Sequence, residues 1–225
     1  MTARSPASLR LVILISGRGS NMAAIARACG DGSIHARVAV VICDRPAVAG
    51  VPLARDLGLE AHVVPYRASP DRAAFEAALG ETIDAYTPDL VILAGFMRIL
   101  TPAFVARYAG RMLNIHPSLL PRYPGLHTHR RVLEAGDREH GSSVHYVTAE
   151  LDGGPVVLQS RITVRTGEPE AQLSARVQAT EYIIYPRVIG WIATGRLAWR
   201  NDRPWLDGQP LAAPVVEDLR DAPER

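Results

Sequence analysis

Asn114 and His116 stand two residues apart in the stretch LNIHPSLLPRYPG, residues 113–125. An apolar run typical of a buried strand ends at these residues, and the alternation along a strand would place both side chains on one face. A carboxamide N–H and an imidazole N–H can donate to the same oxygen atom, so the pair could stabilise an oxyanion. The alternative for His116 is a structural histidine whose hydrogen bonds are satisfied in the core.

Asp152 is the candidate partner of His116, and it stands in the turn AELDGGPV, residues 149–156. The two glycines that follow it let its carboxylate approach closely whatever lies across from it. An Asp-Gly-Gly sequence is most often only a turn. The functional interpretation is a carboxylate that pairs with His116 and keeps a protonated imidazole available as an acid.

The stretch SGRGSN, residues 16–21, follows the first apolar run and could bind an anion. Its glycines tolerate positive φ, and Ser20 and Asn21 stand at a helix start, where backbone N–H groups would point at a phosphate. Met22 occupies the place of the third glycine of GxGxxG, and Asp44 is the nearest match to a ribose-binding acid. A plain tight turn and a mononucleotide phosphate cradle both remain open, and NAD binding is disfavoured.

The stretch GFMRILTP, residues 95–102, follows another apolar run. The backbone from Met97 to Leu100 would line a flat, apolar crevice. The alternative is a buried strand-to-helix turn with hydrophobic anchors, and this stretch on its own favours that alternative.

Three of these stretches follow predicted parallel strands. Continuous apolar runs predict buried strands at residues 9–15, 36–43, 61–65, 89–95 and 111–116. Helical patterns alternate with them, and Ser69 and Pro70 are expected to cap and open the third helix. Strands that alternate with helices predict right-handed βαβ units in a mostly parallel sheet, which binds ligands at the carboxyl ends of its strands.

After residue 140 the alternation of strands and helices stops. Two apolar runs, residues 142–148 and 155–164, lie too close together for a helix between them, which predicts antiparallel strands added to the same sheet. A long amphipathic helix is expected from about Glu168, with a kink at Pro186.

The length and the composition predict one soluble α/β domain. At 225 residues the chain can bury a substantial core, and we expect one domain over residues 1–200 and a C-terminal arm or tail over residues 201–225. No stretch approaches the ~20 apolar residues of a membrane span, and the first apolar run is too short for a signal peptide. The two cysteines lie outside any CxxC motif, which is typical of a reducing compartment, so a cytoplasmic location is expected.

The charged residues exclude several classes of function. A net charge of +2 is too balanced for a nucleic-acid surface. All 25 basic residues are arginine, which rules out Schiff-base chemistry at lysine and any phosphate loop that needs GK[ST]. Metal binding is the main chemical alternative, given His116, His127, His129, His140, His145 and Asp152. The chain has no HExxH motif, no paired cysteines and no dense carboxylate cluster, so no metal is expected.

Five stretches, in this order, resemble the phosphoribosylglycinamide formyltransferase family, folate-dependent enzymes of purine biosynthesis: VILISGRGSN, ILAGFMRIL, LNIHPSLLPRYPGLHTHR, HGSSVHYV and ELDGGPVVLQ. The resemblance runs from about residue 9 to residue 208. HPSLLP and the later DGG are shared more widely by enzymes that handle 10-formyltetrahydrofolate, whereas GxGSN points to the glycinamide ribonucleotide branch. The resemblance implies a Rossmann-like formyltransferase fold, with helices on both faces of a twisted sheet, for the domain over residues 1–200.

The resemblance also implies a role for each candidate site residue. Asn114, His116 and Asp152 resemble the catalytic trio of the family. Gly19, Ser20 and Asn21 would hold the phosphate of glycinamide ribonucleotide, and Glu181 falls where the family contacts that substrate. Met97, Arg98, Ile99 and Leu100 would meet the pterin through backbone groups, together with Asn114, and Arg72 lies where the family contacts the folate. Arg122 stands where many members have lysine, so no ligand contact is assigned to it.

The implied reaction transfers a formyl group from the co-substrate 10-formyltetrahydrofolate to the amine of glycinamide ribonucleotide, without a metal. The expected partners are these two small molecules, with no nucleic acid and no membrane, for a monomer or homodimer. A 10-formyltetrahydrofolate hydrolase would use the same trio but usually carries a regulatory domain ahead of it, and a methionyl-tRNA formyltransferase would carry a β-barrel domain after it. A non-catalytic nucleotide-binding module would explain SGRGSN but would leave the trio without a role.

Overall fold

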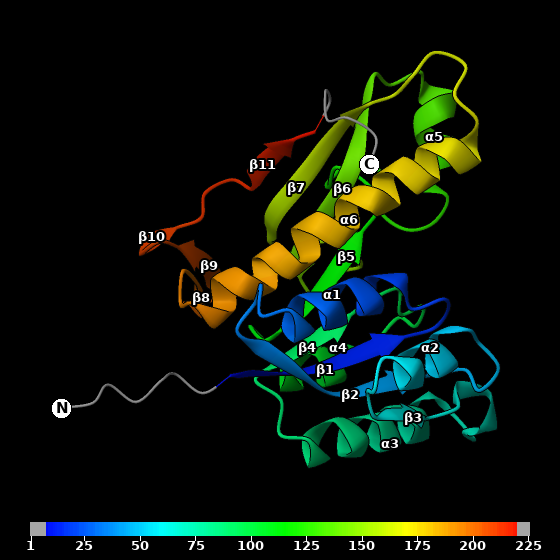
Figure 1. Ribbon diagram of the computed structural model, residues 1–225, viewed down its shortest axis with the longest axis vertical. Helices are drawn as coiled ribbons and strands as arrows, with labels where there is room; N and C mark the ends of the chain where they lie inside the picture. Colours follow the sequence, from blue (N-terminus) through cyan, green and yellow to red (C-terminus); the bar gives the residue numbers. More distant parts are fainter. Residues whose placement is uncertain (1–7, 220–225) are drawn as a thin grey trace.

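The computed structural model describes residues 8–219, and its first half alternates strands with helices (Figure 1). This half contains β1 (Leu9–Ile15), α1 (Ser20–Gly30), β2 (Ala36–Cys43), α2 (Gly50–Asp56), β3 (Ala61–Val63), a 3₁₀ turn (Tyr66–Ala68), α3 (Arg72–Ala85), β4 (Leu90–Leu93), α4 (Pro102–Arg107) and β5 (Met112–His116). The second half contains α5 (Thr128–Ala135), β6 (Glu139–Tyr146), β7 (Val156–Thr163), α6 (Glu170–Ala193), β8 (Leu197–Arg200), β9 (Arg203–Leu206), β10 (Gln209–Pro210) and β11 (Val215–Asp218). Every strand predicted from an apolar run is present, with ends that differ by a few residues.

Eight strands form one sheet in the order β11-β7-β6-β5-β4-β1-β2-β3. β1 pairs in parallel with both β2 and β4, and β5 pairs in parallel with β4. β6 is antiparallel to both of its neighbours, β5 and β7. The prediction of a mostly parallel sheet with antiparallel additions in its C-terminal part is therefore confirmed.

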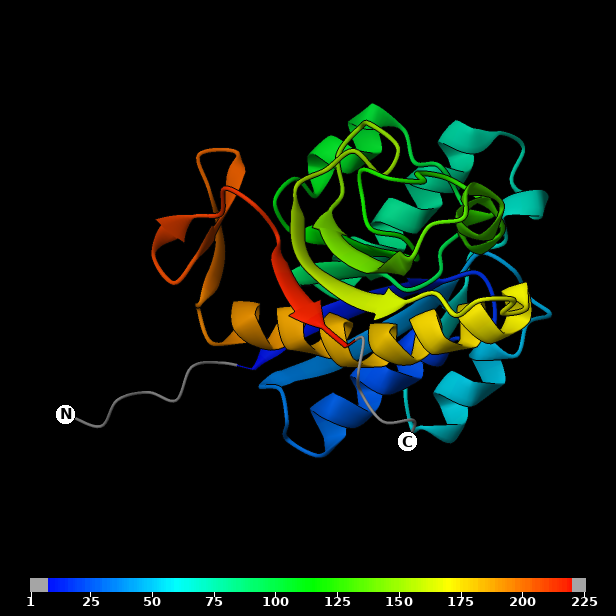
Figure 2. The same ribbon diagram turned by 90° about the horizontal axis from the view of Figure 1, so that it is seen from above.

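Successive side chains of β1 point to opposite faces of the sheet, and helices cover both faces. Leu11, Ile13 and Ile15 are fully buried in a cluster with residues of α1 and α6. Val12 and Leu14 are fully buried on the other face, with residues of α3 and α4. Figure 2 shows α6, in yellow and orange, on one side of the sheet and α4, in green, on the other. Burying each such side chain stabilises the fold by about 1.5–3 kcal/mol, so an unbroken apolar run specifies a strand that is covered twice.

The start of α3 differs from the prediction. Asp71, and not Ser69, is the N-cap, because its Oδ1 atom accepts a hydrogen bond from the N–H of Ala74 at 2.8 Å. The 3₁₀ turn ends at Ala68, so Ser69 still belongs to the connection, where its hydroxyl donates to the carbonyl of Pro65 at 3.3 Å. Both residue types cap helices well, and the negative charge of Asp71 also suits the positive end of the helix dipole.

The short helix α5 is absent from the sequence predictions. It begins after His127 and ends before Gly136, and both of these flanking residues have positive φ. Val132 is its one fully buried apolar residue. The helix has only eight residues, which is shorter than the window of residues in which helical periodicity is recognised in a sequence.

The chain after α6 is also more regular than predicted. β8, β9 and β10 form a small antiparallel sheet, and β11 pairs in parallel with β7 at the edge of the main sheet. Residues 203–218 of the expected arm or tail therefore contain three strands, and residues 220–225 lie outside the described residues. The expected boundary between residues 200 and 201 stays a prediction, and the β8–β9 hairpin lies across it.

The longest helix, α6, is continuous from Glu170 to Ala193 with Pro186 inside it, and the expected kink there stays a prediction. It packs along the sheet through Ile184, Tyr185 and Val188, which are all fully buried. Over residues 8–219, neither this helix nor any other has the length and apolar character that crossing a membrane requires.

Candidate active site

The carboxyl ends of β1, β4 and β5 meet at one edge of the sheet. Strands are added on one side of β1 by β2 and β3, and on the other side by β4 and β5, so a crevice forms where the direction reverses. A cavity of about 360 Å³ opens at this crevice. Its lining includes the glycine turn from Ser16 to Asn21, together with Met97, Ile115, Pro117 and Glu181.

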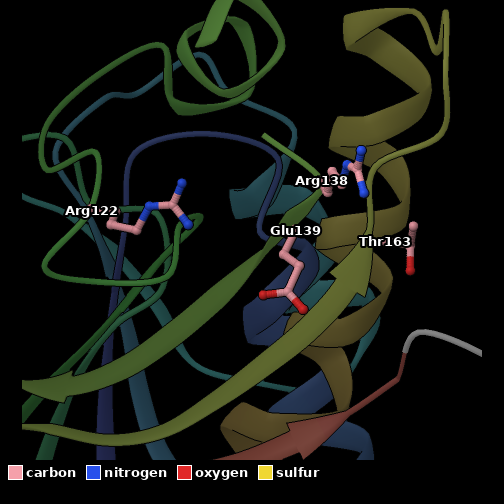
Figure 3. Close-up of a pocket in the computed structure, with 4 residues that line it drawn as sticks. All are labelled: Arg122, Arg138, Glu139 and Thr163. Carbon is pink, nitrogen blue, oxygen red and sulfur yellow. The ribbon is translucent and has the colours of Figure 1, made fainter. Parts of the chain in front are cut away.

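Another cavity, of about 390 Å³, lies beside the β6–β7 pair (Figure 3). It is lined by Arg122, Arg138, Glu139 and Thr163, none of which is a predicted site residue. Arg122 pairs with Asp137, and Glu139 also has an ion-pair partner within the chain. Because these charges are largely compensated, we place the candidate site at the strand ends, although its cavity is slightly smaller.

His116 and Asp152 lie next to the cavity at the strand ends, and they face each other. The Nδ1 atom of His116 is 3.4 Å from the Oδ2 atom of Asp152, and both side chains are less than one-tenth exposed. The backbone N–H of Gly125 donates to the same Oδ2 atom at 2.8 Å. The Nε2 atom of His116 donates to the carbonyl of Tyr123 at 2.9 Å. Both ring nitrogens of His116 therefore face oxygen atoms that can accept a hydrogen bond.

Asn114 joins the same cluster through a residue that has no assigned role in the sequence, His145. The antiparallel register of β5 and β6 places His145 directly opposite Asn114, and the Nδ2 atom of Asn114 lies 3.1 Å from Nε2 of His145. The other ring nitrogen, Nδ1, donates to the carbonyl of Tyr146 at 3.0 Å, so Nε2 carries the lone pair and accepts from the carboxamide. Burial lowers the pKa of His145, which keeps this ring neutral.

The hydrogen bond to His145 therefore fixes the orientation of the Asn114 carboxamide. One of its N–H bonds points at His145, and the second remains available to a ligand. His145 also lies 3.9 Å from the carboxylate of Asp152. It therefore stands between Asn114 and Asp152, two members of the trio. The structure thus brings Asn114, His116 and Asp152 together in one cluster, as the sequence predicts, and adds His145 to it.

The glycine turn before α1 leaves the start of that helix open. Gly19 is the N-cap residue, with φ of 74°, and no side chain caps the helix. A Cβ atom on Gly19 would lie 3.0 Å from the Cα atom of Gly50, so the turn is packed closely against the start of α2. The uncapped N–H groups and the positive end of the helix dipole suit an anion at this end of the cavity.

Asn21 and Glu181 connect α1 to α6 at the wall of the cavity. The Nδ2 atom of Asn21 donates to Oε2 of Glu181 at 2.7 Å, and both residues are buried. Burial raises the pKa of Glu181 to about 7, and the hydrogen bond from Asn21 opposes this shift. Ser20 accepts a hydrogen bond from Gln178 at 3.2 Å. Ser20, Asn21 and Glu181 therefore lie together, as expected for residues that contact one substrate.

The Met97–Leu100 segment begins at the cavity, because Met97 lines it together with the glycine turn. Its neighbour Phe96 and its last residue Leu100 are buried as hydrophobic anchors, while Met97 and Ile99 are 58% and 66% exposed. The N–H of Met97 donates to the hydroxyl of Ser16 at 2.8 Å, which ties the segment to the end of β1. The buried residues are the hydrophobic anchors that the sequence suggested, and a role of the backbone in lining a crevice stays a prediction.

The side chains of Arg72 and Arg98 bind the protein itself. Arg98 donates to Asp44 at 2.5 Å, and Arg72 donates to the carbonyl of Ile99 at 2.5 Å. Asp44 is consequently engaged by an arginine, and it is not available to bind a ribose. The side chain of Arg72 is nearly half exposed and keeps a free face toward solvent.

His129 and His140 pack against each other. His129 lies in the first turn of α5, and its Nδ1 atom lies 3.0 Å from Nε2 of His140. Burial, reinforced by His129, lowers the pKa of His140 to about 3. Over residues 8–219, no three His, Cys, Asp or Glu side chains are placed so that they could hold a metal ion. The stretch His-Thr-His, residues 127–129, forms the start of α5, and its two histidines do not form a chelating pair.

Comparisons with known proteins agree with this geometry. The family model of formyl transferases matches residues 9–189. The chain is 53% identical over 203 residues to phosphoribosylglycinamide formyltransferase of Escherichia coli, covering 90% of this chain and 96% of that protein. It is 41% identical over 202 residues to the enzyme of the same name from Haemophilus influenzae, with 90% and 95% covered. A solved structure of phosphoribosylglycinamide formyltransferase from Coxiella burnetii in complex with CHES superposes with a TM-score of 0.87 at 47% identity, over 92% of this chain and 99% of that one.

Proposed function

Because the chain belongs to the formyl transferase family, we propose that it transfers the formyl group of 10-formyltetrahydrofolate to the amine of glycinamide ribonucleotide, a step of purine biosynthesis. The observation that carries this proposal is the cluster of Asn114, His116 and Asp152 beside a cavity that ends at an uncapped helix N-terminus. Two donors for an oxyanion and a cradle for a phosphate are what this reaction needs from a protein.

The ribonucleotide binds at the glycine turn. Its phosphate accepts hydrogen bonds from the N–H groups at the start of α1, near Gly19, Ser20 and Asn21, where the helix dipole also favours negative charge. Glu181 accepts from the hydroxyls of the ribose. That role explains why a carboxylate stands at a buried position, since the ligand supplies the hydrogen bonds that stabilise its charge.

The folate binds along the Met97–Leu100 segment. Within residues 8–219, no hydrogen bond uses the N–H of Arg98 or of Leu100, so both are available to the edge of a flat heterocycle. The exposed side chains of Met97 and Ile99 flank it with apolar surface. Arg72 offers its exposed guanidinium to a carboxylate of the folate. Bound in this way, the folate supplies the formyl group.

The amine of the ribonucleotide is the nucleophile, so no serine, cysteine or lysine nucleophile is needed. Free α-amino groups have pKa values of about 7.7–8.0, so the neutral amine is accessible near physiological pH. Negative charge then develops on the formyl oxygen, where the free N–H of Asn114 and the Nε2–H of His116 donate to it. One such donor is typically worth about 3–4 kcal/mol of barrier.

His116 must exchange one hydrogen bond to do this. Its Nε2–H donates to the carbonyl of Tyr123, and the formyl oxygen takes the place of that carbonyl. Asp152 faces Nδ1 on the other side of the ring, where its carboxylate favours positive charge on the imidazole. The proton lost by the attacking amine passes through Asp152 to the departing folate nitrogen, because a doubly protonated His116 has no lone pair with which to accept it.

Incubation of the purified full-length chain with 10-formyltetrahydrofolate, with and without glycinamide ribonucleotide, tests the proposal. We expect release of tetrahydrofolate only when the ribonucleotide is present. Equal release without it would identify a hydrolase, and no release in either case would leave the chain a binding module. A cytoplasmic location, a monomer or homodimer, and the absence of a metal and of nucleic-acid or membrane partners stay predictions.

A further inference from the structure

The Met97–Leu100 segment belongs to no helix or strand, yet it is held at several points. Regular elements fix their backbone through repeated internal hydrogen bonds, and this segment has none. A backbone that binds a ligand must nevertheless keep its N–H groups in place before the ligand arrives. The side chains that hold the segment therefore belong to the binding function.

Glu76, from α3, holds the end of this segment. Its Oε1 atom accepts from the N–H of Thr101 at 2.8 Å and from Nε of Arg72 at 3.2 Å. Its Oε2 atom accepts from the hydroxyl of Thr101. The side chain of Glu76 is only 9% exposed, so this carboxylate is buried with both of its oxygens engaged. A buried charge with so many partners fixes the positions of all of them.

Arg72 extends the reach of Glu76 into the segment. Glu76 orients the guanidinium through Nε, and the Nη2 atom of Arg72 donates to the carbonyl of Ile99 at 2.5 Å. The carbonyl of Ile99 is thereby turned toward α3. The N–H groups on either side of Ile99, those of Arg98 and Leu100, remain unused within the described residues.

Asp44 holds the same segment from a second element. Its carboxylate, at the end of β2, is fully buried and accepts from Nε of Arg98 at 2.5 Å. The guanidinium of Arg98 also lies over the ring of Tyr66, with 4.1 Å between Cζ and the ring centre. Two buried carboxylates on separate elements thus hold the segment, Glu76 from α3 and Asp44 from the end of β2.

We propose that Glu76 is a positioning residue of the folate site, which acts with Asp44 to keep the backbone of the Met97–Leu100 segment ready for a pterin. This inference rests on the proposed function, because it takes the pterin as the occupant of the segment. Neither carboxylate touches a substrate in this assignment. Their loss weakens binding of the folate and leaves the ribonucleotide end of the cavity unchanged.

The test compares Glu76→Gln with Glu81→Gln in the full-length chain. Both changes remove one negative charge from α3, but Glu81 is exposed and contacts no part of the segment. We expect Glu76→Gln to raise the KM for 10-formyltetrahydrofolate about tenfold, because a small misplacement of the binding groups is costly. The KM for the ribonucleotide and kcat should hardly change, and Glu81→Gln should resemble the wild type. Asp44→Asn should show the same selective rise as Glu76→Gln.

Thr101 provides a second variant if Glu76→Gln does not fold. Thr101→Val removes the hydroxyl that donates to Glu76 and should raise the folate KM selectively, whereas Thr101→Ser keeps that hydroxyl and should behave as the wild type. An unchanged folate KM in a folded variant, or equal rises in both KM values, would overturn the proposal.

Failure of the proposed function can be told apart from failure of this inference. If the wild-type chain does not formylate the ribonucleotide, calorimetric titration with tetrahydrofolate alone still measures the affinity of the segment for a pterin. Weaker binding by Glu76→Gln than by Glu81→Gln would support the positioning role. Equal binding by the two variants, or no binding by the wild type, would refute it.

Discussion

His116 and Asp152 face each other at 3.4 Å between Nδ1 and Oδ2, and the N–H of Gly125 donates to the same carboxylate oxygen. Asp152 has a positive φ of 52° in the turn that carries it. The aspartate side chain is less than one-tenth exposed. Because Asp152 pairs with Nδ1, only the Nε2–H of His116 is directed at a substrate.

Asp152→Asn should lower kcat by about a hundredfold, with little change in either KM. The amide keeps the size of the side chain and can still accept from Gly125, but it no longer stabilises a positive charge on His116. Steady-state kinetics with each substrate varied in turn provide the measurement. Asp31→Asn, at an exposed turn, is the matched control and should retain wild-type kcat. A kcat within about threefold of the wild type would remove Asp152 from the mechanism.

His145→Phe should lower kcat by about tenfold and leave both KM values nearly unchanged. Phenylalanine fills the buried space but offers no acceptor, so the carboxamide of Asn114 can rotate away from its reactive orientation. Adding the change to Asn114→Ala distinguishes orientation from a general loss of packing. If His145 acts through Asn114, the double variant should be no slower than Asn114→Ala alone, whereas additive losses would assign His145 a separate role.

The KM for the ribonucleotide should depend on pH through Glu181. Burial raises the pKa of this carboxyl to about 7, so it is protonated below that pH and ionised above it. Ribose hydroxyls donate to the ionised form, and the KM should therefore rise as the pH falls below 7, by up to about tenfold per pH unit. Steady-state kinetics from about pH 5.5 to about pH 8.5, which lie on either side of this pKa, give the dependence of KM on pH. In Glu181→Gln the profile should lose this component, and an identical profile would contradict the assignment.

The elements that carry the site follow from local patterns in the sequence. An unbroken apolar run such as residues 9–15 can only be a strand covered on both faces, and the polar residues that end such runs collect at one edge of a parallel sheet. That reasoning was sufficient to place Asn114 and His116 beside the glycine turn. The pairing with Asp152 was one of two interpretations that the residues left open, because an Asp-Gly-Gly turn has no chemical signature of its own.

What the sequence did not reveal depends on contacts between distant segments. His145 meets Asn114 only through the register of two antiparallel strands, and that register cannot be read from either strand alone. Glu76 looks like one more polar residue of an amphipathic helix, and its role appears only when Thr101 is brought against it. β11 is too short and too polar to be recognised as a strand before β7 offers it an edge.

The central claim is that Asn114 and His116 stabilise charge on the formyl oxygen while the group passes to the ribonucleotide amine. The direct measurement follows a ¹³C-labelled formyl group from 10-formyltetrahydrofolate, by mass spectrometry of the ribonucleotide and of free formate. The wild type should place the label on the ribonucleotide, and Asn114→Ala and His116→Ala should do so at least about a hundredfold more slowly while still binding both substrates. Label that appears mainly as formate in the wild type, or transfer at an undiminished rate in either variant, would contradict the account.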